Sequence, residues 1–206
     1  MDKIRVLLAD DHAIVRTGLA TLIEAKGGVE VVGEAAHGDE AVKKALKLKP
    51  DVVVMDILMP VKDGIQATRE IVAAQPDARV LILTTSTVAS DISKALDAGA
   101  TGAVTKSSDN AMLVNAIKSV AAGKRTLSPD IADILSSEPP LPELTERQAK
   151  LLAFASKGLS NPEIARLLGI TVIAVKKHFE VIYAKIGASN RSEAIAIALR
   201  NNLLKS

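Results

Sequence analysis

Five polar side chains follow or end apolar runs of the sequence, where together they could bind a phosphoryl group and accept it on a carboxylate. Asp10 and Asp11 directly follow the apolar run IRVLLA, and Asp56 follows the run DVVVM. Thr84 ends a third apolar run, and Lys106 comes directly after a fourth. A carboxylate nucleophile, two more carboxylates, a hydroxyl donor and a fixed cation suit phosphoryl transfer onto a carboxylate. We therefore expect the chemistry at Asp56, with Thr84 and Lys106 offsetting charge on the phosphoryl oxygens.

The three carboxylates need a cation if they meet. Unpaired, they would repel and raise one another's pKa values. A hard divalent ion that takes oxygen ligands removes this repulsion, and Mg²⁺ suits open sites that water and phosphate complete. We therefore expect Mg²⁺ at Asp10, Asp11 and Asp56. The neighbouring His12 is not expected to be a ligand, because Mg²⁺ prefers oxygen.

Each of these residues alone has an ordinary structural explanation. An Asp after a strand often forms a turn or caps a helix, a lone Lys usually lies on the surface, and Thr is common in strands. Four strand ends that each deliver a polar group to one edge are not expected by accident.

Residues 1–123 alternate five short apolar runs with five amphipathic stretches, the pattern of a right-handed doubly wound parallel sheet. The expected strands are 4–9, 29–35, 51–55, 79–84 and 102–105. In such sheets, ligands bind in the crevice at the carboxyl ends of the strands. The predicted fold is therefore α/β and flavodoxin-like, with five parallel strands and the polar residues at one edge.

The helical and strand periodicity lapses over residues 124–143, which we expect to be a linker between domains. Its segment Pro139-Pro140-x-Pro142 favours an extended, semi-rigid spacer. A short helix from Ser128, with Pro129 at its first position, is expected inside the linker.

Residues 144–206 switch to an all-helical pattern. Four helices are expected, and their capping residues are Thr145, Ser160, Thr171 and Asn190. The second and third helices are joined through Leu168-Gly169-Ile170. Two short helices joined in this way form a helix-turn-helix, whose second helix enters the major groove of DNA.

Charge divides the chain at the same place. Residues 1–142 carry 16 Lys and Arg against 19 Asp and Glu, a net −3, whereas residues 143–206 carry 10 against 5, a net +5. The basic excess suggests a polyanion partner for the last third. The absence of cysteine fits a reducing compartment, and no signal peptide or membrane span is visible, so a cytoplasmic protein is expected.

With these motifs, residues 1–123 resemble a response-regulator receiver domain, and the whole chain resembles the NarL/FixJ family. The resemblance implies specific roles: the acidic pair is Asp10 and Asp11, the phosphoacceptor Asp56, the switch residues Thr84 and Lys106, and the metal also binds the backbone carbonyl of Leu58. It also implies that a sensor histidine kinase donates the phosphoryl group. Receivers commonly carry an aromatic residue three positions before the lysine, but this chain has Ala103 there. We therefore expect activation through the Thr84 loop and helix surfaces.

The strings LTERQ, GLSNPEIARLLGI, VKKH and AKIGASNRSEA resemble the LuxR-type four-helix DNA-binding domain. Lys176 and Lys177 fall early in its recognition helix, where they can reach phosphates or base edges. Lys185 and Arg191 are expected to contact further phosphates. The ordinary alternative for these basic residues is a solvated helix face.

Two residues of the recognition helix depart from the pattern of relatives. Ala174 stands where threonine is frequent, and Glu180 stands where a basic contact is found. Glu180 would repel phosphate unless it accepts a hydrogen bond from a cytosine amine. Val172 and Ile173 could meet a thymine methyl group, although packing is their default role.

The leading hypothesis is a transcription regulator in which phosphate on Asp56 favours a homodimer that binds promoter DNA. The first and fifth helices could form the dimer face, with Ile14 and Met112 as candidates or, equally, as core residues. One alternative is a phosphohydrolase with an aspartyl nucleophile. Such enzymes usually place an acid two residues after the nucleophile, where this chain has Leu58, so only slow self-dephosphorylation is expected. Another alternative is a regulator that acts independently of phosphate.

Overall fold

The structure, a computed structural model, describes residues 3–137, 144–201 and 203–204. The chain divides into two compact units, Met1–Glu138 and Pro139–Ser206. Each unit has its own hydrophobic core, and each is described by itself below.

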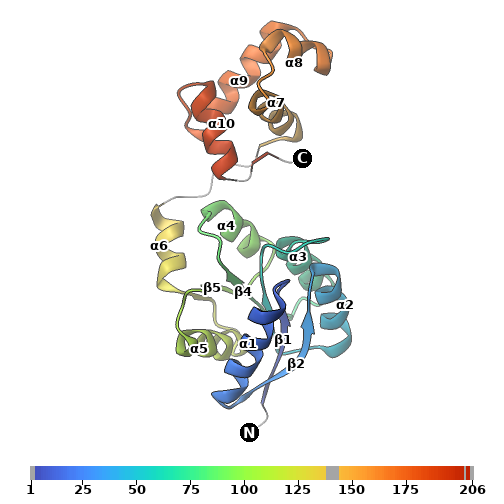
Figure 1. Ribbon diagram of the computed structural model, residues 1–206, viewed down its shortest axis with the longest axis vertical. Helices are drawn as coiled ribbons and strands as arrows, with labels where there is room; N and C mark the ends of the chain where they lie inside the picture. Colours follow the sequence, from blue (N-terminus) through green and yellow to red (C-terminus); the bar gives the residue numbers. More distant parts are fainter. Residues whose placement is uncertain (1–2, 138–143, 202, 205–206) are drawn as a thin grey trace. The chain divides into compact units, whose positions relative to one another are not determined.

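The first unit is built on one parallel sheet. Its strands are β1 (Ile4–Ala9), β2 (Val29–Ala35), β3 (Val52–Met55), β4 (Val80–Thr84), β5 (Gly102–Thr105) and β6 (Thr126–Leu127). They lie in the order β2-β1-β3-β4-β5-β6, and every pair is parallel. Figure 1 labels β1, β2, β4 and β5 in this sheet. The five predicted strands are confirmed, and the two-residue β6 extends the sheet by one strand that the sequence did not predict.

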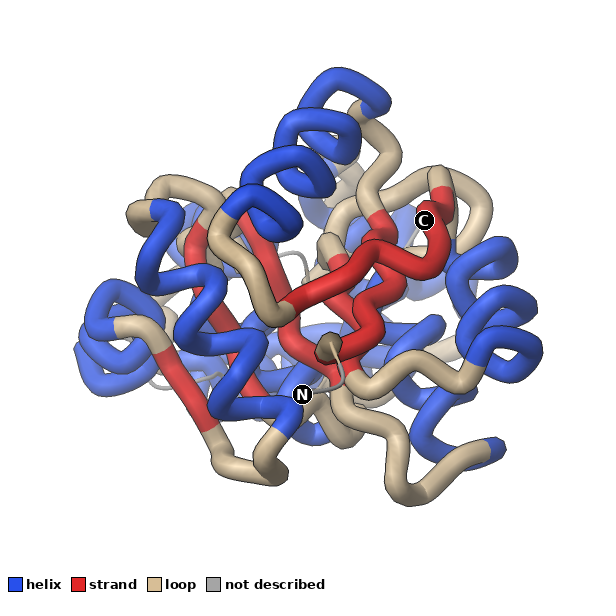
Figure 2. Tube along the Cα trace, turned by 90° about the horizontal axis from the view of Figure 1, so that it is seen from below, coloured by secondary structure: helices blue, strands red, loops and turns tan. Residues whose placement is uncertain are grey.

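Helices cover both faces of this sheet (Figure 2). They are α1 (Ala13–Ala25), α2 (Gly38–Leu48), α3 (Gly64–Ala74), α4 (Ala89–Asp97), α5 (Asn110–Ala121) and α6 (Pro129–Ser137). Helices α1 and α5 pack on one face, and α2, α3, α4 and α6 pack on the other. This two-sided cover is the doubly wound arrangement that the alternating pattern predicted.

The central strand β3 explains why its sequence is apolar without interruption. Val53 and Met55 enter the core beneath α2, α3, α4 and α6, whereas Val52 and Val54 enter the core beneath α1 and α5. Successive side chains of a strand point to opposite faces. Since both faces are covered, every position of β3 is buried.

Most of the segment predicted as a linker, 124–143, belongs to the first unit. The predicted short helix after Ser128 is confirmed as α6, and its Ile131 is fully buried in the core that α2, α3 and α4 share. Strand β6 pairs with β5. The Pro-rich spacer predicted at residues 139–142 lies outside the described residues.

The second unit contains the four predicted helices. They are α7 (Glu146–Ser156), α8 (Asn161–Leu168), α9 (Val172–Ile186) and α10 (Arg191–Arg200). The predicted caps Thr145, Thr171 and Asn190 accept hydrogen bonds from backbone N–H groups in the first turns of their helices. At α8, Glu163 closes the turn by accepting from the Ser160 N–H at 2.7 Å. Among the described helices of the chain, none combines the length and apolar character needed to cross a lipid bilayer.

The turn between α8 and α9 needs a residue with left-handed backbone geometry. Gly169 supplies it with φ 64°, and its N–H closes back on Arg166. Glycine adopts this conformation without the steric strain of a Cβ atom. The connection is therefore tight enough to make α8 and α9 a helix-turn-helix, as predicted.

Candidate functional site

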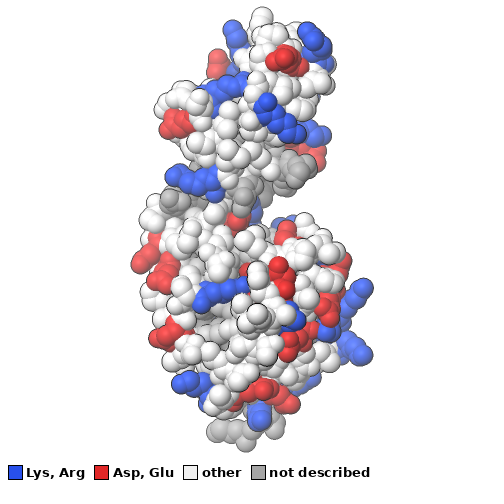
Figure 3. Space-filling model, viewed as in Figure 1, with Lys and Arg blue, Asp and Glu red and all other residues white. Residues whose placement is uncertain are grey.

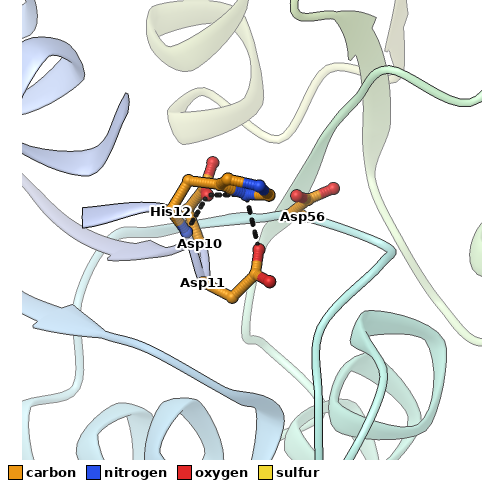
Figure 4. Close-up of side chains that lie close together, drawn as sticks. All are labelled: Asp10, Asp11, His12 and Asp56. Carbon is orange, nitrogen blue, oxygen red and sulfur yellow. Dashed lines mark hydrogen bonds and ion pairs between the residues drawn. The ribbon is translucent and has the colours of Figure 1, made fainter. Parts of the chain in front are cut away.

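The predicted acidic residues meet at the carboxyl edge of the sheet. Ala9 and Met55 are partners in the β1–β3 register, so Asp10 and Asp56 follow two neighbouring strands at the same level. Their exposed fractions are only 3% and 4%. One ligand atom from each of Asp10, Asp11, Asp56 and His12 lies within 4.8 Å of the others (Figure 4). The structure therefore brings the three predicted carboxylates together.

Lys106 joins this cluster from β5. Its Nζ lies 2.7 Å from Asp10 Oδ2 and 2.5 Å from Asp56 Oδ2. The side chain of Lys106 is 14% exposed, so the ion pairs are shielded from water. The ammonium group thus bridges two buried carboxylates that follow different strands.

Burial and this bridge act in opposite directions on the titrating groups. Burial raises the pKa of the Asp56 carboxyl, and the hydrogen bond from Lys106 offsets only part of the increase. Burial favours the neutral form of Lys106, but the hydrogen bonds to Asp10 and Asp56 and the negative charges of these two carboxylates together outweigh burial and raise its pKa. Lys106 is therefore a fixed cation, and Asp56 is a carboxylate whose negative charge is poorly solvated.

Thr84 ends β4 beside this cluster. Its backbone carbonyl accepts from the Lys106 N–H at 2.8 Å, and its side chain is fully buried. The Thr84 hydroxyl accepts from the Ser86 N–H at 3.0 Å. The backbones of the two predicted switch residues are thus adjacent, and the hydroxyl binds the start of the loop that leads to α4.

Two further residues flank the carboxylates: Leu58, whose carbonyl is a predicted metal ligand, and His12, which is not expected to bind the metal. The N–H of Leu58 lies 3.4 Å from Asp56 Oδ1, which places residue 58 next to the phosphoacceptor candidate. The His12 Nδ1 lies 2.8 Å from Asp11 Oδ1, and its side chain is 68% exposed. His12 therefore contacts the acidic cluster from the solvent side.

Arg16 is a further residue at this site that the sequence analysis did not identify. Its guanidinium donates to the carbonyl of Asp10 at 2.6 Å and to Glu34 Oε2 at 2.8 Å. These bonds fix the backbone that carries the acidic pair to α1 and to the end of β2. No sequence pattern identifies the role, because it depends on a contact between side chains of two elements, from residues 18 apart in the sequence.

The second unit presents a mixed face on α9. Val175, Phe179 and Ile182 are buried in its core. On the opposite side, Ile173 is 79% exposed, and Lys176 and Lys177 are also exposed. Lysine and arginine side chains are spread over the visible face of the unit (Figure 3). Lys176 and Lys177 therefore lie where a recognition helix can present them to DNA.

The other two predicted DNA contacts differ from each other. Lys185 is partly exposed in the last turn of α9. The guanidinium of Arg191 points into the unit instead. It donates to Asn161 Oδ1 at 3.0 Å and to the carbonyl of Leu159, and its Cζ lies 5.1 Å from the centre of the Phe179 ring. Arg191, at the start of α10, therefore contacts α8 and α9 and links the three helices.

Comparisons with known proteins cover both units. Residues 6–118 match the response regulator receiver domain family, and residues 142–198 match the bacterial regulatory proteins of the luxR family. The chain is 37% identical to the transcriptional regulatory protein LiaR of Bacillus subtilis strain 168, over 98% of this chain and 99% of LiaR.

Solved structures agree with these matches. A LuxR-family two-component response regulator from Aurantimonas sp. SI85-9A1 is 46% identical, with a TM-score of 0.64 over 66% of this chain and 97% of that one. The response regulator ChrA of a heme-sensing two-component system is 38% identical, with a TM-score of 0.60 over 98% of this chain and 100% of ChrA. The chain therefore belongs to the response regulators that carry a LuxR-type DNA-binding domain, the NarL/FixJ family that its sequence resembles.

Proposed function

We propose that this response regulator accepts a phosphoryl group on Asp56 from a sensor histidine kinase and thereby controls transcription. The observation that carries the proposal is the contact between Lys106 Nζ and Asp56 Oδ2 at 2.5 Å, in a cluster of buried carboxylates. This contact places a fixed positive charge beside the oxygen that would attack phosphorus. The proposed function places the protein in the cytoplasm, where promoter DNA is found.

The proposed transfer exchanges one bond to phosphorus for another. A carboxylate oxygen of Asp56 attacks the phosphorus of the kinase's phosphohistidine, and the P–N bond breaks as the O–P bond forms. Burial leaves the Asp56 carboxylate poorly solvated, so little hydration must be removed before it attacks. Lys106 then offsets the charge on a phosphoryl oxygen, and the Thr84 hydroxyl donates to another.

The donor set at this site fits Mg²⁺. Carboxylate oxygens of Asp10, Asp11 and Asp56 would hold the ion, together with the backbone carbonyl of Leu58. Mg²⁺, when bound, supplies positive charge that offsets the developing charge on the phosphoryl oxygens. The exposed, nitrogen-bearing His12 stays outside this set in our proposal.

Leu58 also limits what the site can do after transfer. Its side chain is apolar and 54% exposed, so residue 58 offers no acid or base to direct water at the phosphoryl group. We therefore assign the chain phosphoacceptor activity with slow self-dephosphorylation rather than the turnover of a phosphohydrolase.

We further propose that Lys176, Lys177 and Lys185 contact promoter DNA and that phosphorylation promotes a homodimer. Two linked recognition helices bind two half-sites with higher affinity than one helix binds a single half-site. Ile14 on α1 is 90% exposed and Met112 on α5 is partly buried, which supports the first and fifth helices as the dimer face.

The test compares the wild-type chain with Asp56→Asn. Both proteins are incubated with acetyl phosphate, with Mg²⁺ or with EDTA, and are then separated on phosphate-affinity gels and by size-exclusion chromatography. We expect a phosphorylated species and a dimer only for the wild type with Mg²⁺. Equal labelling of both proteins would refute Asp56 as the acceptor, and labelling in EDTA would refute the role of the metal. A labelled wild type that binds DNA no better than Asp56→Asn would support regulation independent of phosphate.

A further inference from the structure

Strand β6 and helix α6 are built onto the strand that carries Lys106. Leu127 is the register partner of Ala103 on β5, and the N–H of Ser128 donates to the carbonyl of Ala103 at 3.0 Å. Both Ala103 and Ser128 are buried. The segment that leads into α6 thus continues the sheet, although its sequence carries no strand pattern.

Helix α6 packs against α4 and β5. Ile131 has no exposed surface and lies in the same core cluster as Ala103 and Ile92 of α4. Ile134 and Leu135 pack partly buried against that cluster. The small side chain of Ala103 leaves room on β5 for the apolar face of α6. Helix α6 therefore packs directly on the strand.

A polar contact ties the first turn of α6 to the same strand. The Thr105 hydroxyl donates to Asp130 Oδ2 at 3.3 Å. It also accepts from Ser107 Oγ at 3.0 Å and lies 2.9 Å from Ser108 Oγ. A hydroxyl has one hydrogen and two lone pairs. With Asp130 as acceptor, both serines donate and Thr105 is fully satisfied.

Thr105 connects this hydrogen-bond network to the proposed phosphorylation site. It precedes Lys106 in the chain, and it is the register partner of Thr84 in the β4–β5 pair. Adjacent residues of a strand point to opposite faces, and register partners in a parallel pair point to the same face. The side chain of Thr105 therefore lies on the Thr84 side of β5, where α6 packs.

We propose that Asp130 and Ile131 are positioning residues of the phosphorylation switch, through which α6 senses the position of the Lys106 end of β5. The proposal rests on the function proposed above. In the structure, Lys106 is held by Asp10 and Asp56, and α6 is docked. When Lys106 and Thr84 turn to a phosphoryl group, the end of β5 shifts, the Thr105–Asp130 bond breaks, and α6 loosens.

The coupling has a direct route to the second unit, because the chain continues from α6 into residues 138–143 and then α7. It must also act in reverse, since linkage between two states is reciprocal. A variant with weaker α6 contacts should therefore bind a phosphoryl group or its analogue at Asp56 more tightly, at most by the factor by which the bound analogue weakens α6 docking.

The first experiment measures hydrogen–deuterium exchange over residues 129–137 of the full chain, with and without beryllofluoride and Mg²⁺. We expect at least tenfold faster exchange in this segment when the analogue is bound, and no response in Asp56→Asn. A wild type that binds the analogue but keeps the same exchange over 129–137 would overturn the inference and leave the proposed function intact. A wild type that does not bind the analogue would overturn both.

The second experiment measures beryllofluoride affinity in the presence of Mg²⁺ for Asp130→Ala, Thr105→Val and the control Asp133→Ala. Asp133 is an exposed acid on the same helix. We expect at least threefold tighter binding for the first two variants and none of this gain for the control. A merely structural role of Asp130 would change exchange in α6 without changing this affinity, and that outcome would refute the coupling.

Discussion

At the residue scale, the proposed chemistry depends on how Lys106 divides its charge between two carboxylates. Its Nζ contacts Asp10 Oδ2 at 2.7 Å and Asp56 Oδ2 at 2.5 Å, and both acids are buried. A divalent ion that binds the same carboxylates competes with the ammonium group for their negative charge. Lysine and metal are therefore partly interchangeable as counter-charges, although only lysine is covalently fixed.

This competition predicts the behaviour of Lys106→Met. Without metal, the variant leaves two buried carboxylates unpaired, so we expect its free energy of unfolding to fall by about 3 kcal/mol. Mg²⁺ should then raise its Tm by more than it raises that of the wild type. Thermal unfolding across a MgCl₂ titration measures both effects, with the exposed Lys47→Met as control. A Tm that responds to Mg²⁺ no more strongly than the wild type would contradict the competition.

Arg191 and Lys176 predict two distinct effects on DNA binding. Arg191 is engaged inside the second unit, so Arg191→Met should lose about 1–3 kcal/mol in the free energy of unfolding and leave the salt dependence of DNA binding unchanged.

Lys176 is exposed on α9, so Lys176→Ala should reduce the magnitude of the slope of log affinity against log salt by about one. Fluorescence anisotropy at several salt concentrations, with a duplex selected from random DNA by the wild type, measures the slopes. A lower slope in Arg191→Met would restore Arg191 as a phosphate contact.

These residues also show what sequence can predict about a site. The clustering of Asp10, Asp56 and Lys106 follows from topology, because the carboxyl ends of all strands in a parallel sheet lie at one edge, whatever the side chains are. The inward direction of Arg191 does not follow from any pattern. A basic residue in the first turn of a helix can reach solvent or neighbouring carbonyls, and only the packing of α7, α8 and α9 decides between them.

At the element scale, the loop between β3 and α3 holds the site because Gly64 has no side chain. A Cβ atom there would lie 1.9 Å from the carbonyl oxygen of Asp56, closer than any real contact. The N–H of Gly64 also donates to the carbonyl of Ile57 at 2.9 Å. The first residue of α3 thus packs directly on the backbone of the proposed phosphoacceptor.

The close approach predicts that Gly64→Ala displaces the loop. We expect a loss of about 1–3 kcal/mol in the free energy of unfolding and a slower reaction of Asp56 with acetyl phosphate. Gly18→Ala is the matched control, because nothing lies within 4 Å of a Cβ at that exposed position in α1. The control should gain about 0.5–1 kcal/mol, since alanine favours a helix interior over glycine. Denaturant unfolding and phosphate-affinity gels give the two readouts; a Gly64→Ala chain that phosphorylates at the wild-type rate would show that the loop tolerates the displacement.

The elements also divide into those that sequence reveals and those that it does not. Five strands and the main helices follow from apolar periodicity and capping residues. Strand β6 is only two residues long, and its pairing with Ala103 is set by the turn after α5 and by the seat of α6. Two residues are too few to show the alternating pattern of a strand. The predicted linker therefore began at residue 124, although β6 and α6, which follow, pack on the sheet.

At the scale of the whole molecule, the two units differ in charge as their proposed partners require. Residues 1–142 carry a net −3, and residues 143–206 carry a net +5. Opposite net charges let one chain present an acidic cluster, which we propose holds a metal ion, and a basic surface, which we propose contacts DNA phosphates. The salt dependence of DNA binding should therefore arise in the second unit, while in our proposal phosphorylation changes how many such units act together.

The proposed dimer should select DNA that carries two half-sites at a fixed spacing. Two recognition helices in one symmetric dimer meet the same face of the double helix when their half-sites are about 10–10.5 base pairs apart, one helical turn, or a multiple of that spacing. Selection from a random library by the acetyl phosphate-treated wild type should therefore return paired half-sites at that spacing, whereas Asp56→Asn should return single half-sites. Five extra base pairs rotate one half-site to the opposite side of the duplex. Inserting them should remove the gain in affinity that phosphorylation gives, in an anisotropy titration at fixed salt. If the gain survives the insertion, phosphorylation does not act by pairing two rigidly placed recognition helices.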